Sequence, residues 1–498
     1  MKTSLKASVA LVALAAPAFA QDIVQADSEW FTNGAAAVEA RAAATPNTGT
    51  ARNVILFVAD GMGVGTNYAV RLFAGQQAGG LGDDYVLPYE AFPNSALVKT
   101  YTINGQTPDS APTAGAMNTG IKQRNEMINV TGDVMVDDCQ GGLDAAPLTL
   151  LSEIATDMGK SVGIISTARL THATPAAVYA RTVNRNWEDD TAIPEGCGQV
   201  DIAAQMIEAM KAGTLDLALG GGGRYFVSAD VTLDEGYTGV RADGRDMISE
   251  ITEMGGQFAW NAETLEGLTP SLETGPILGF FENSHMEYEA DRSDEPSIAE
   301  MTAFAIETLS QNEGGFYLEV EGGRVDHANH GGNLARAVAD GVAFAEAVQM
   351  AIDMTDASET LIIVTADHEH AIAFNGYCGR GSDILGLCLD VNTQGVEGTE
   401  PLLAADGKPY TVAGYLNGAG SVITEQEDGT WSGARPDLTE EEATDLDYLQ
   451  QALVPMGSET HSGEDVAIWA NGPWAHLVNG TMEQNEIFHV INHAISAE

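Results

Sequence analysis

The feature that most constrains the fold of this chain is a continuous apolar run over 53–59 (NVILFVA) that ends directly in Asp60. A strand that is apolar on both faces is typical of a parallel sheet covered by helices on both sides. Similar apolar runs follow at 161–167, 216–222, 315–320, 360–366 and 465–470. Helical patterns lie between them, at 145–158, 201–212, 296–311 and 333–354. This alternation predicts an α/β fold with a mostly parallel central sheet and helices on both faces.

The charge balance excludes several classes of partner. The chain has 498 residues, with 22 Lys and Arg against 72 Asp and Glu, and its formal net charge at pH 7 is −50. Such acidity excludes general nucleic-acid binding, which needs a basic face, and argues against docking on anionic lipid. Charge repulsion at low salt predicts a halophilic or marine protein that is more stable at molar salt. The alternative is that the charge serves solubility alone.

The first twenty residues have the order of an export signal. Two lysines precede an apolar stretch, and residues 18–20 (AFA) fit the small-x-small cleavage rule. We expect a signal peptide over 1–20 and an exported protein, periplasmic or extracellular, although a buried first helix is the alternative. No later run reaches the roughly 18 apolar residues of a membrane helix, so we expect no membrane partner.

Two further stretches lie outside the alternating pattern. Residues 21–50 are rich in Ala and predict an N-terminal arm. Residues 376–457 are rich in Gly, Thr, Asp and Glu, and predict an accessory lobe, with a helix at 439–453, inserted in a catalytic domain over 51–498. A disordered loop is the alternative for 376–457.

Four cysteines remain after export, which suits two disulfides with three possible pairings. The natural pairing is Cys139–Cys197 and Cys378–Cys388, because each closes a nearby loop. The lack of a CxxC or CxxH pattern argues against zinc held by cysteine.

Carboxylates and imidazoles gather where the predicted strands end, the edge at which open parallel sheets bind their ligands. Each residue alone is typical of a helix cap or a hydrogen-bonded histidine. Together they indicate a site for several metal ions, since Asp, Glu and His suit zinc whereas carboxylate and hydroxyl oxygens suit magnesium. They are Asp60, His172, Thr174, Glu321, Asp326, His327, His330, Asp367, His368, His370 and His461.

A candidate nucleophile, Ser110, lies in the run 107–120 (TPDSAPTAGAMNTG). Either Thr107 or Asp109 is a suitable N-cap, which would put Ser110 in the first turn of a helix, where free N–H groups favour a phosphate. The absence of a GxSxG elbow argues against an ordinary Ser-His-Asp hydrolase. A serine beside zinc is instead activated by coordination. The alternative is that Ser110 only caps the helix.

Taken together, these segments resemble the alkaline phosphatases. The motifs are VADGMG, TPDSAPTAG, THATPAAVYARTVNRNW, EVEGGRVDHANHGG, TADHEH and ETHSGEDV. The resemblance covers roughly 53–375 and 455–495, and is weak over 376–455. It implies hydrolysis of small-molecule phosphate monoesters, with broad specificity, through a phosphoserine at Ser110. It also implies a homodimer, with the arm and the inserted lobe near the subunit interface.

The resemblance further implies three metal sites per chain, two for zinc and one for magnesium. The first zinc site takes Asp326, His330 and His461. The second takes Asp60, Asp367 and His368. The magnesium site takes Asp60, Thr174 and Glu321, so that Asp60 bridges two metals.

The remaining roles concern the phosphate and the third metal. Arg185 resembles the phosphate clamp of the family and Asp109 is placed to steady it, whereas Arg181 precedes the motif and has no expected role. Histidines at 172 and 327 replace the Asp and Lys of some members, which leaves the third site open to zinc or cobalt. We expect His172 to act through water and His327 to modulate bound phosphate, with His370 outside the ligand sets.

Two alternative functions remain at this point. A sibling metallo-esterase, such as a phosphodiesterase, phosphonate hydrolase or sulfatase, would use the same metal scaffold. A sulfatase needs a C/S-x-P-x-R context, and the sequence after Ser110 has no arginine at that place. The second alternative is a secreted, acidic metal-binding protein without catalytic activity.

Overall fold

The computed structural model describes residues 23–233, 236–391 and 397–497, and the chain divides into two units. The first unit, Met1–Thr45, contains the helix α1 (Glu29–Ala43), none of whose residues is buried. The second unit, Pro46–Glu498, contains the other elements. The expected signal peptide, 1–20, lies outside the described residues.

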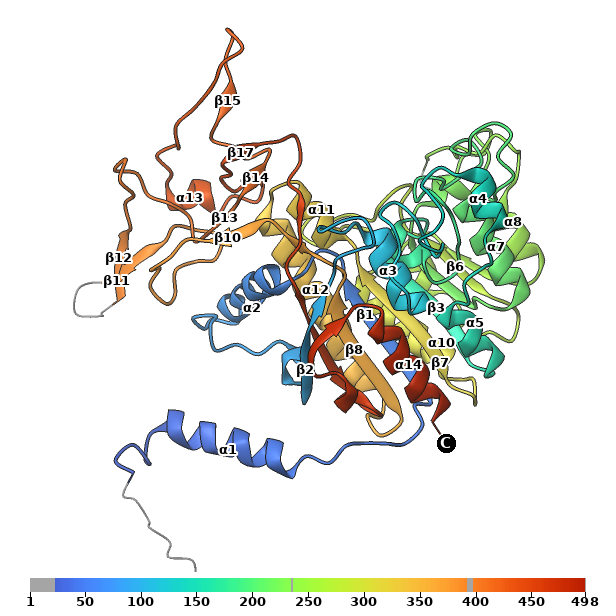
Figure 1. Cartoon of the computed structure of the whole chain (residues 1–498), viewed down its shortest axis with the longest axis horizontal. Coiled ribbons are helices and arrows are strands. Elements are labelled where there is room, and N and C mark those ends of the chain that lie inside the picture. Colours follow the sequence, from blue (N-terminus) through green and yellow to red (C-terminus); the bar gives the residue numbers. More distant parts are fainter. Residues whose placement is uncertain (1–22, 234–235, 392–396, 498) are drawn as a thin grey trace, which may run out of the picture. The chain divides into compact units, whose positions relative to one another are not determined.

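A ten-stranded sheet forms the centre of the second unit (Figure 1). The strand β1 (Asn53–Ala59) lies between β7 (Phe316–Gly322) and β8 (Thr360–Ala366), is parallel to both, and is buried throughout. The other strands are β2 (Asn94–Lys99), β3 (Ser161–Arg169), β4 (Leu217–Gly221), β5 (Gln257–Ala259), β6 (Ile277–Phe280), β19 (Val466–Asn471) and β20 (Gly480–Glu483).

The strand order is β20-β2-β19-β8-β1-β7-β3-β4-β6-β5. Neighbouring strands of this sheet are parallel except where β19 pairs with β2 and β8, which it meets antiparallel. The predicted α/β fold with a mostly parallel sheet is therefore confirmed, with one reversed strand making the sheet mixed.

Helices cover both faces of this sheet, as the alternation of side chains along β7 shows. Tyr317 and Glu319 hydrogen-bond to Asn118 on the helix α3 (Ser110–Thr119). Gly322, an even-numbered residue at the end of the same strand, faces Phe344 on α12 (Leu334–Met354). Because successive residues of a strand point to opposite faces, α3 and α12 lie on opposite sides. Glu321 therefore points to the side on which Ser110 begins its helix.

The other large helices complete the two layers. The helices α2 (Val64–Gln77) and α10 (Ile298–Leu309) pack against α12, while α5 (Leu151–Asp157) and α14 (Glu486–Ser496) pack against α3. The helix α7 (Ile202–Ala212) lies farther along the sheet and packs against α8 (Met247–Glu253).

Two expected helices are shorter than their sequence patterns. The 145–158 pattern yields α5, which begins after Pro147 and Leu150, and the 439–453 pattern yields only α13 (Glu440–Ala443). Shortly after α13, the Asp445 carboxylate accepts a hydrogen bond from the N–H of Asp447 at 2.9 Å. Such a local bond competes with the helix and ends the pattern.

The stretch 376–457 contains short paired strands where it is described. The pairs of this region, including the strand β10 just before it, are β11 (Leu389–Val391) with β12 (Glu397–Pro401), β10 (Ile372–Phe374) with β13 (Ala413–Tyr415), β14 (Asn417–Gly418) with β17 (Val454–Pro455), and β15 (Thr424–Glu425) with β16 (Trp431–Ser432). They form a lobe beside α2 and α11 (Arg324–His330), shown in orange in Figure 1.

Both expected disulfides are present. Cys139 pairs with Cys197, with their Cα atoms 5.6 Å apart, and Cys378 pairs with Cys388 at 4.9 Å. Disulfides are typical of oxidising compartments outside the cytosol. Within the described ranges, no helix has the length and apolar character needed to cross a bilayer.

Candidate active site

Three neighbouring strands deliver carboxylates to one edge of the sheet. Asp60 follows β1, Glu321 lies near the end of β7, and Asp367 follows β8. Val58 pairs with Glu321 across β1 and β7, and Ala59 pairs with Ala366 across β1 and β8. This register brings the three buried carboxylates together, although Asp60 lies more than 250 positions before the other two in sequence.

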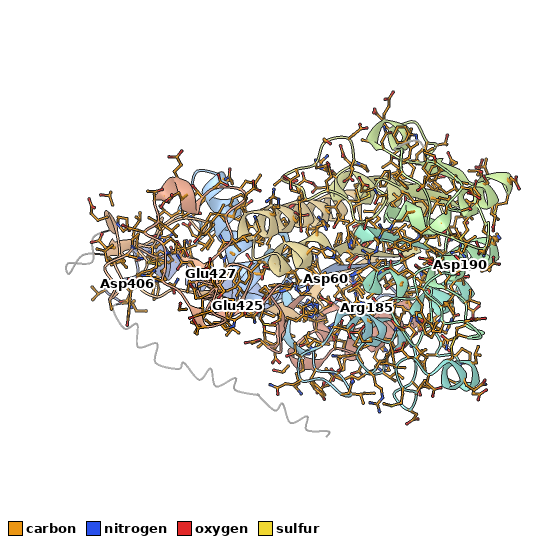
Figure 2. All side chains as sticks on the ribbon, turned by 90° about the horizontal axis from the view of Figure 1, so that it is seen from above. Asp60, Arg185, Asp190, Asp406, Glu425 and Glu427 are labelled. Atoms are coloured by element: carbon orange, nitrogen blue, oxygen red, sulfur yellow. A yellow bond between two sulfur atoms is a disulfide. The ribbon has the colours of Figure 1, made fainter. Side chains whose placement is uncertain are left out.

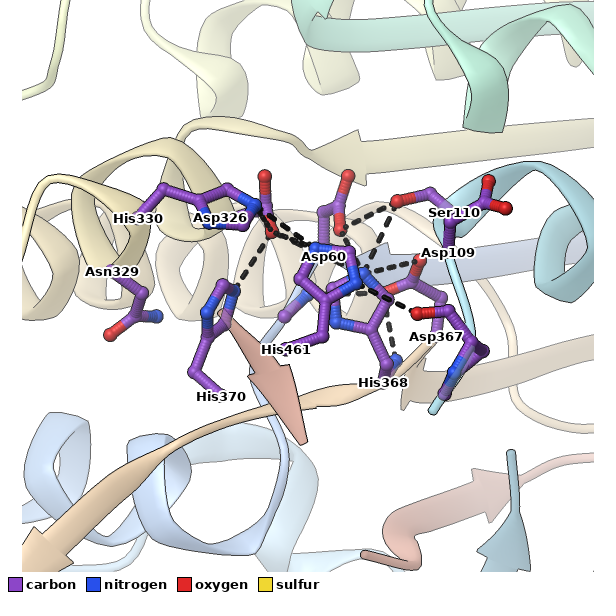
Figure 3. Close-up of polar contacts among 12 residues, drawn as sticks. Asp60, Asp109, Ser110, Asp326, Asn329, His330, Asp367, His368, His370 and His461 are labelled. Atoms are coloured by element: carbon purple, nitrogen blue, oxygen red, sulfur yellow. Dashed lines mark hydrogen bonds and ion pairs between the residues drawn. The ribbon is translucent and has the colours of Figure 1, made fainter. Parts of the chain in front are cut away.

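Ser110 is the first residue of α3 and is buried, with 2% of its surface exposed. Of the two cap candidates, Asp109 is the N-cap, and its carboxylate accepts a hydrogen bond from the N–H of Ala111 at 2.8 Å. The Ser110 hydroxyl oxygen lies 3.2 Å from His368 Nε2 and 3.4 Å from Asp60 Oδ1 (Figure 3).

Asp60, Asp367 and His368 form one tight group. His368 Nε2 lies 3.3 Å from Asp60 Oδ1 and 3.4 Å from Asp367 Oδ2, and all three residues are fully buried. Burial raises the pKa of Asp60 well above its usual range, and the neighbouring carboxylates Asp367 and Asp326 raise it further. Two buried carboxylates beside an imidazole make a site that favours a bound cation.

A second group contains Asp326, His330 and His461. The Nε2 atoms of both histidines lie near Asp326 Oδ1, at 3.4 Å for His330 and 3.3 Å for His461. The Nδ1 atoms face main-chain carbonyls, that of Glu459 at 2.6 Å and that of Pro108 at 2.9 Å.

These contacts fix the ring protons of the two histidines. A carbonyl oxygen only accepts, so each neutral ring carries its proton on Nδ1 and leaves a lone pair on Nε2. The two Nε2 atoms lie 3.0 Å apart. Two facing lone pairs at this distance repel each other, and a cation held between them and the carboxylate would remove that repulsion, so this group fits a metal ion of the zinc class.

His370 lies beside this group but is already paired on both sides. Its Nε2 is 2.8 Å from Asp326 Oδ1, and its Nδ1 is 2.5 Å from Glu459 Oε2. Although burial lowers the pKa of His370, the two carboxylates raise it to about 10. A doubly paired imidazolium orients Asp326 and does not offer a lone pair to a metal.

A third group joins Asp60 to His172 and Glu321, with Thr174 in α6 (Ala173–Ala176) beside Glu321. The Ser166 hydroxyl donates to Glu321, whereas burial raises the pKa of Glu321 to about 8. Among the described residues, the buried atoms Asp60 Oδ2, Glu321 Oε1 and His172 Nδ1 have no hydrogen-bond partner. An arginine only donates, so His172 Nε2, 2.9 Å from Arg185 Nη2, accepts, and the neutral ring carries its proton on Nδ1.

Arg185 faces the same cavity as Ser110. Its Nη1 donates to Asp109 Oδ1 at 3.0 Å, and its Nη2 lies 2.9 Å from His172 Nε2. Arg185 and Ser110 line a cavity of about 760 Å³, with His327 and His461 also on its wall. Arg181 points elsewhere, because its guanidinium donates to the Leu148 carbonyl and to Glu153.

His327 lies at the wall of the cavity and not in a ligand group. Its ring lies 5.5 Å from that of His172 and 4.0 Å from that of His285, measured between centroids. Burial lowers the pKa of His327 to about 3, so the ring is neutral at neutral pH.

Several residues at the site were missed from the sequence, among them Glu126, Ser166, His285 and Glu459. Of these, only Glu459 carried a signal, since it lies two positions before His461 in the ETHSGED motif.

The acidic side chains outside the site are spread widely. Asp190, Asp406, Glu425 and Glu427 lie well away from Asp60 and Arg185 (Figure 2).

Comparisons with known proteins show the family to which the chain belongs. The family model described as "Alkaline phosphatase" matches residues 51–497. The chain is 38% identical to the alkaline phosphatase of Gadus morhua, over 90% of this chain and 93% of that protein. It is 38% identical to the tissue-nonspecific isozyme of Rattus norvegicus (90% and 84%) and 37% identical to a membrane-bound alkaline phosphatase of Bombyx mori (93% and 84%).

Solved structures share the fold at lower identity. The alkaline phosphatase of Thermus thermophilus has a TM-score of 0.64 and 23% identity, covering 91% of this chain and 93% of that one. The enzyme of the Antarctic bacterium TAB5 has a TM-score of 0.60 and 22% identity, covering 91% and 99%. At these identities the solved structures show the fold alone. The family match and the relatives at 38% identity show the family membership of the chain. The chain belongs to the alkaline phosphatase family.

Proposed function

We propose that this enzyme hydrolyses phosphate monoesters to an alcohol and inorganic phosphate, with broad specificity, through a phosphoserine at Ser110. The observation that carries the proposal is the position of the Ser110 hydroxyl. It lies at the N-terminus of α3, against His368 and Asp60, in the cavity that Arg185 also lines. The contacts that support the proposal all concern the phosphoryl group and not the alcohol, which is the basis for broad specificity.

Two zinc ions fit the first two ligand groups. Asp326, His330 and His461 would hold one, supported by the two facing Nε2 lone pairs. Asp60, Asp367 and His368 would hold the other, beside Ser110. When bound, zinc supplies Lewis acidity that lowers the proton affinity of a nearby hydroxyl and stabilises negative oxygens.

The residues of the chain supply position and charge. The Ser110 oxygen attacks phosphorus in line with the departing alcohol, and the phosphoserine is then cleaved by water. The first N–H groups of α3 and its positive dipole end favour the phosphoryl oxygens. Arg185 grips two of these oxygens in a bidentate fork while Asp109 holds its Nη1.

The third site would be held by Asp60, Thr174 and Glu321, with magnesium as the expected ion. His172 lies in the same group as Asp60 and Glu321. Its Nε2 accepts from Arg185, so its Nδ1 carries the proton, and the ring would act on the third ion through water.

A comparison of substrates tests the proposed function. The enzyme reloaded with zinc and magnesium is assayed on p-nitrophenyl phosphate and on bis-p-nitrophenyl phosphate. A monoester rate far above the diester rate supports the proposal. The reverse order supports the sibling phosphodiesterase, and metal binding without turnover of either ester supports a non-catalytic protein.

The organisation of the chain is part of the proposal. The catalytic domain spans 51–498 with the accessory lobe at 376–457, the arm is 21–50, and 1–20 directs export to the periplasm or the medium. A homodimer is supported by the exposed apolar residues Val64, Tyr85 and Val86, which line one surface cavity of about 680 Å³. Light scattering on the parent and on Val86→Asp tests this, with a shift toward monomer expected for the variant and no shift contradicting it.

A further inference from the structure

Glu126 has an unusual backbone conformation at the edge of the catalytic cavity. Its φ angle is 71°, in the left-handed region that side chains other than Gly, Asn and Asp rarely adopt. Two other residues of this segment share a positive φ, Asn129 and Asp137, but both belong to the tolerant types. A strained residue of this kind persists only where its surroundings hold it in place, and such residues cluster at functional sites.

The peptide groups of Glu126 hold both members of the phosphate clamp. Its N–H donates to Asp109 Oδ2 at 2.5 Å, and its carbonyl accepts from the N–H of Arg185 at 2.8 Å. The other oxygen of Asp109 receives Arg185 Nη1 at 3.0 Å and the N–H of Ala111 at 2.8 Å. Glu126, Asp109 and Arg185 thus form a closed ring of hydrogen bonds beside Ser110.

The Glu126 side chain itself has no comparable contact. It is exposed and lines the mouth of the cavity. Burial and the neighbouring Asp109 raise the pKa of Glu126. When ionised, its carboxylate would repel a phosphate dianion. The contribution of this residue to the site therefore comes from its backbone.

The segment after Glu126 braces the loop that carries Arg185. Ile128 exchanges two main-chain hydrogen bonds with Thr182, both 3.0 Å long. Beneath them lies a small separate core, whose members are Met127, Val130, Val134, Val183 and Trp187. The left-handed turn at Glu126 lets one segment reach this core and Asp109 together.

We propose that Glu126 is a positioning residue for phosphate binding, and that its left-handed peptide fixes the orientation of Arg185 and Asp109 over Ser110. The inference rests on the proposed role of Arg185 as the phosphate clamp. It predicts that phosphate affinity follows the tolerance of residue 126 for positive φ, and not its charge or size.

Four variants test this: Glu126→Gly, Glu126→Asn, Glu126→Gln and Glu126→Val. The dissociation constant for inorganic phosphate is measured by calorimetry on zinc-loaded protein, with zinc content and melting temperature recorded alongside. Gly and Asn keep both backbone hydrogen bonds without strain, so they should bind within about threefold of the parent. The Gln variant should do the same, while Val, which is β-branched, should weaken binding at least about tenfold with zinc content unchanged.

A matched control and a coupling test separate positioning from general damage. Tyr377 also has a positive φ, 67°, and is 96% exposed in the accessory lobe. Tyr377→Val imposes the same backbone penalty and should leave phosphate binding unchanged. In an Arg185→Ala background, Glu126→Val should weaken binding no further, because its effect passes through Arg185.

The outcomes are distinguishable. Equal phosphate affinity of the Val and Gly variants, or a loss in Gln equal to that in Val, overturns the inference. If the Val variant does not fold, the Gly and Asn variants still test the inference. Weak phosphate binding by the Gly variant overturns it. Parent-like binding by the Gly and Asn variants, with raised melting temperatures, supports it. A parent protein that binds no phosphate when zinc-loaded contradicts the proposed function itself.

Discussion

The hydroxyl oxygen of Ser110 lies 3.2 Å from Nε2 of His368, although 258 positions separate the two residues. The contact joins the start of α3 to the end of β8, so the fold itself places the candidate nucleophile among metal-ligand types. A serine that only capped a helix would have no reason to lie there.

Ser110→Ala should abolish turnover while leaving the metal sites intact. The alanine keeps the helix but removes the attacking oxygen, so kcat for a monoester should fall at least about a thousandfold. Zinc content by atomic absorption should stay at the parent value.

Ser297→Ala is the matched control, because Ser297 caps α10 through the N–H of Glu300 and lies outside the site. It should cost about 1 kcal/mol of stability without changing kcat. Turnover retained in Ser110→Ala would remove the phosphoserine from the account.

His172→Asp should change the metal preference of the third site. The substitution replaces an unpartnered buried nitrogen with oxygens, which magnesium prefers. The variant should bind magnesium more tightly and show a larger stimulation by magnesium than the parent. Titration of both proteins with magnesium, after loading with a limiting amount of zinc, measures this. An identical magnesium response in both would mean that His172 does not face the third ion.

High salt should stabilise the protein. With a net charge of −50, self-repulsion acts over about 10 Å at 0.1 M salt and over about 3 Å at 1 M. The melting temperature should therefore rise between 0.1 M and 2 M sodium chloride. Scanning calorimetry at several salt concentrations checks this, and a steady fall would show that the acidity serves solubility alone.

Asp340→Asn should stabilise the enzyme at alkaline pH. Burial raises the pKa of the Asp340 carboxyl to about 8, while the same group ionises near pH 4 in the unfolded chain. Between about pH 4 and pH 8 this carboxyl ionises in the unfolded chain but stays protonated in the folded protein. The free energy of unfolding therefore falls as pH rises. Asparagine can still accept the 3.1 Å hydrogen bond from the Glu289 N–H and carries no such penalty.

The melting temperature of Asp340→Asn should exceed that of the parent by about 2 °C or more at pH 9, with a smaller difference at pH 5. Asp353→Asn, at an exposed position of the same helix, is the control for loss of one charge. A gain in Asp340→Asn that does not depend on pH would show that Asp340 is ionised in the folded protein.

The sequence predicted those parts of the structure that depend on local patterns. The buried strand at 53–59 and its successors gave the sheet, because apolar runs of that length have few other solutions. The sequence also named the carboxylates and histidines that the structure brings together, since strand ends and family motifs mark them. Their role as metal ligands stays a prediction. The disulfide pairs followed from loop closure.

The remaining features depend on tertiary contacts that no local pattern reports. Glu126 acts through its backbone conformation, and a glutamate carries no sequence signal for a positive φ. Glu459 matters because folding places its carboxylate against His370 and its carbonyl against His330. The expected helix at 439–453 was wrong beyond α13, since the Asp445 side chain competes with the helical hydrogen bonds.

Metal reconstitution tests the central claim most directly. The protein is stripped with a chelator, reloaded with zinc, magnesium or both, and assayed on p-nitrophenyl phosphate at pH 9–10, with Ser110→Ala treated alongside. The account predicts that activity returns with zinc, rises further when magnesium is added, and does not return in the variant. No activity in the parent under any loading, despite zinc bound at two ions per chain, would contradict it.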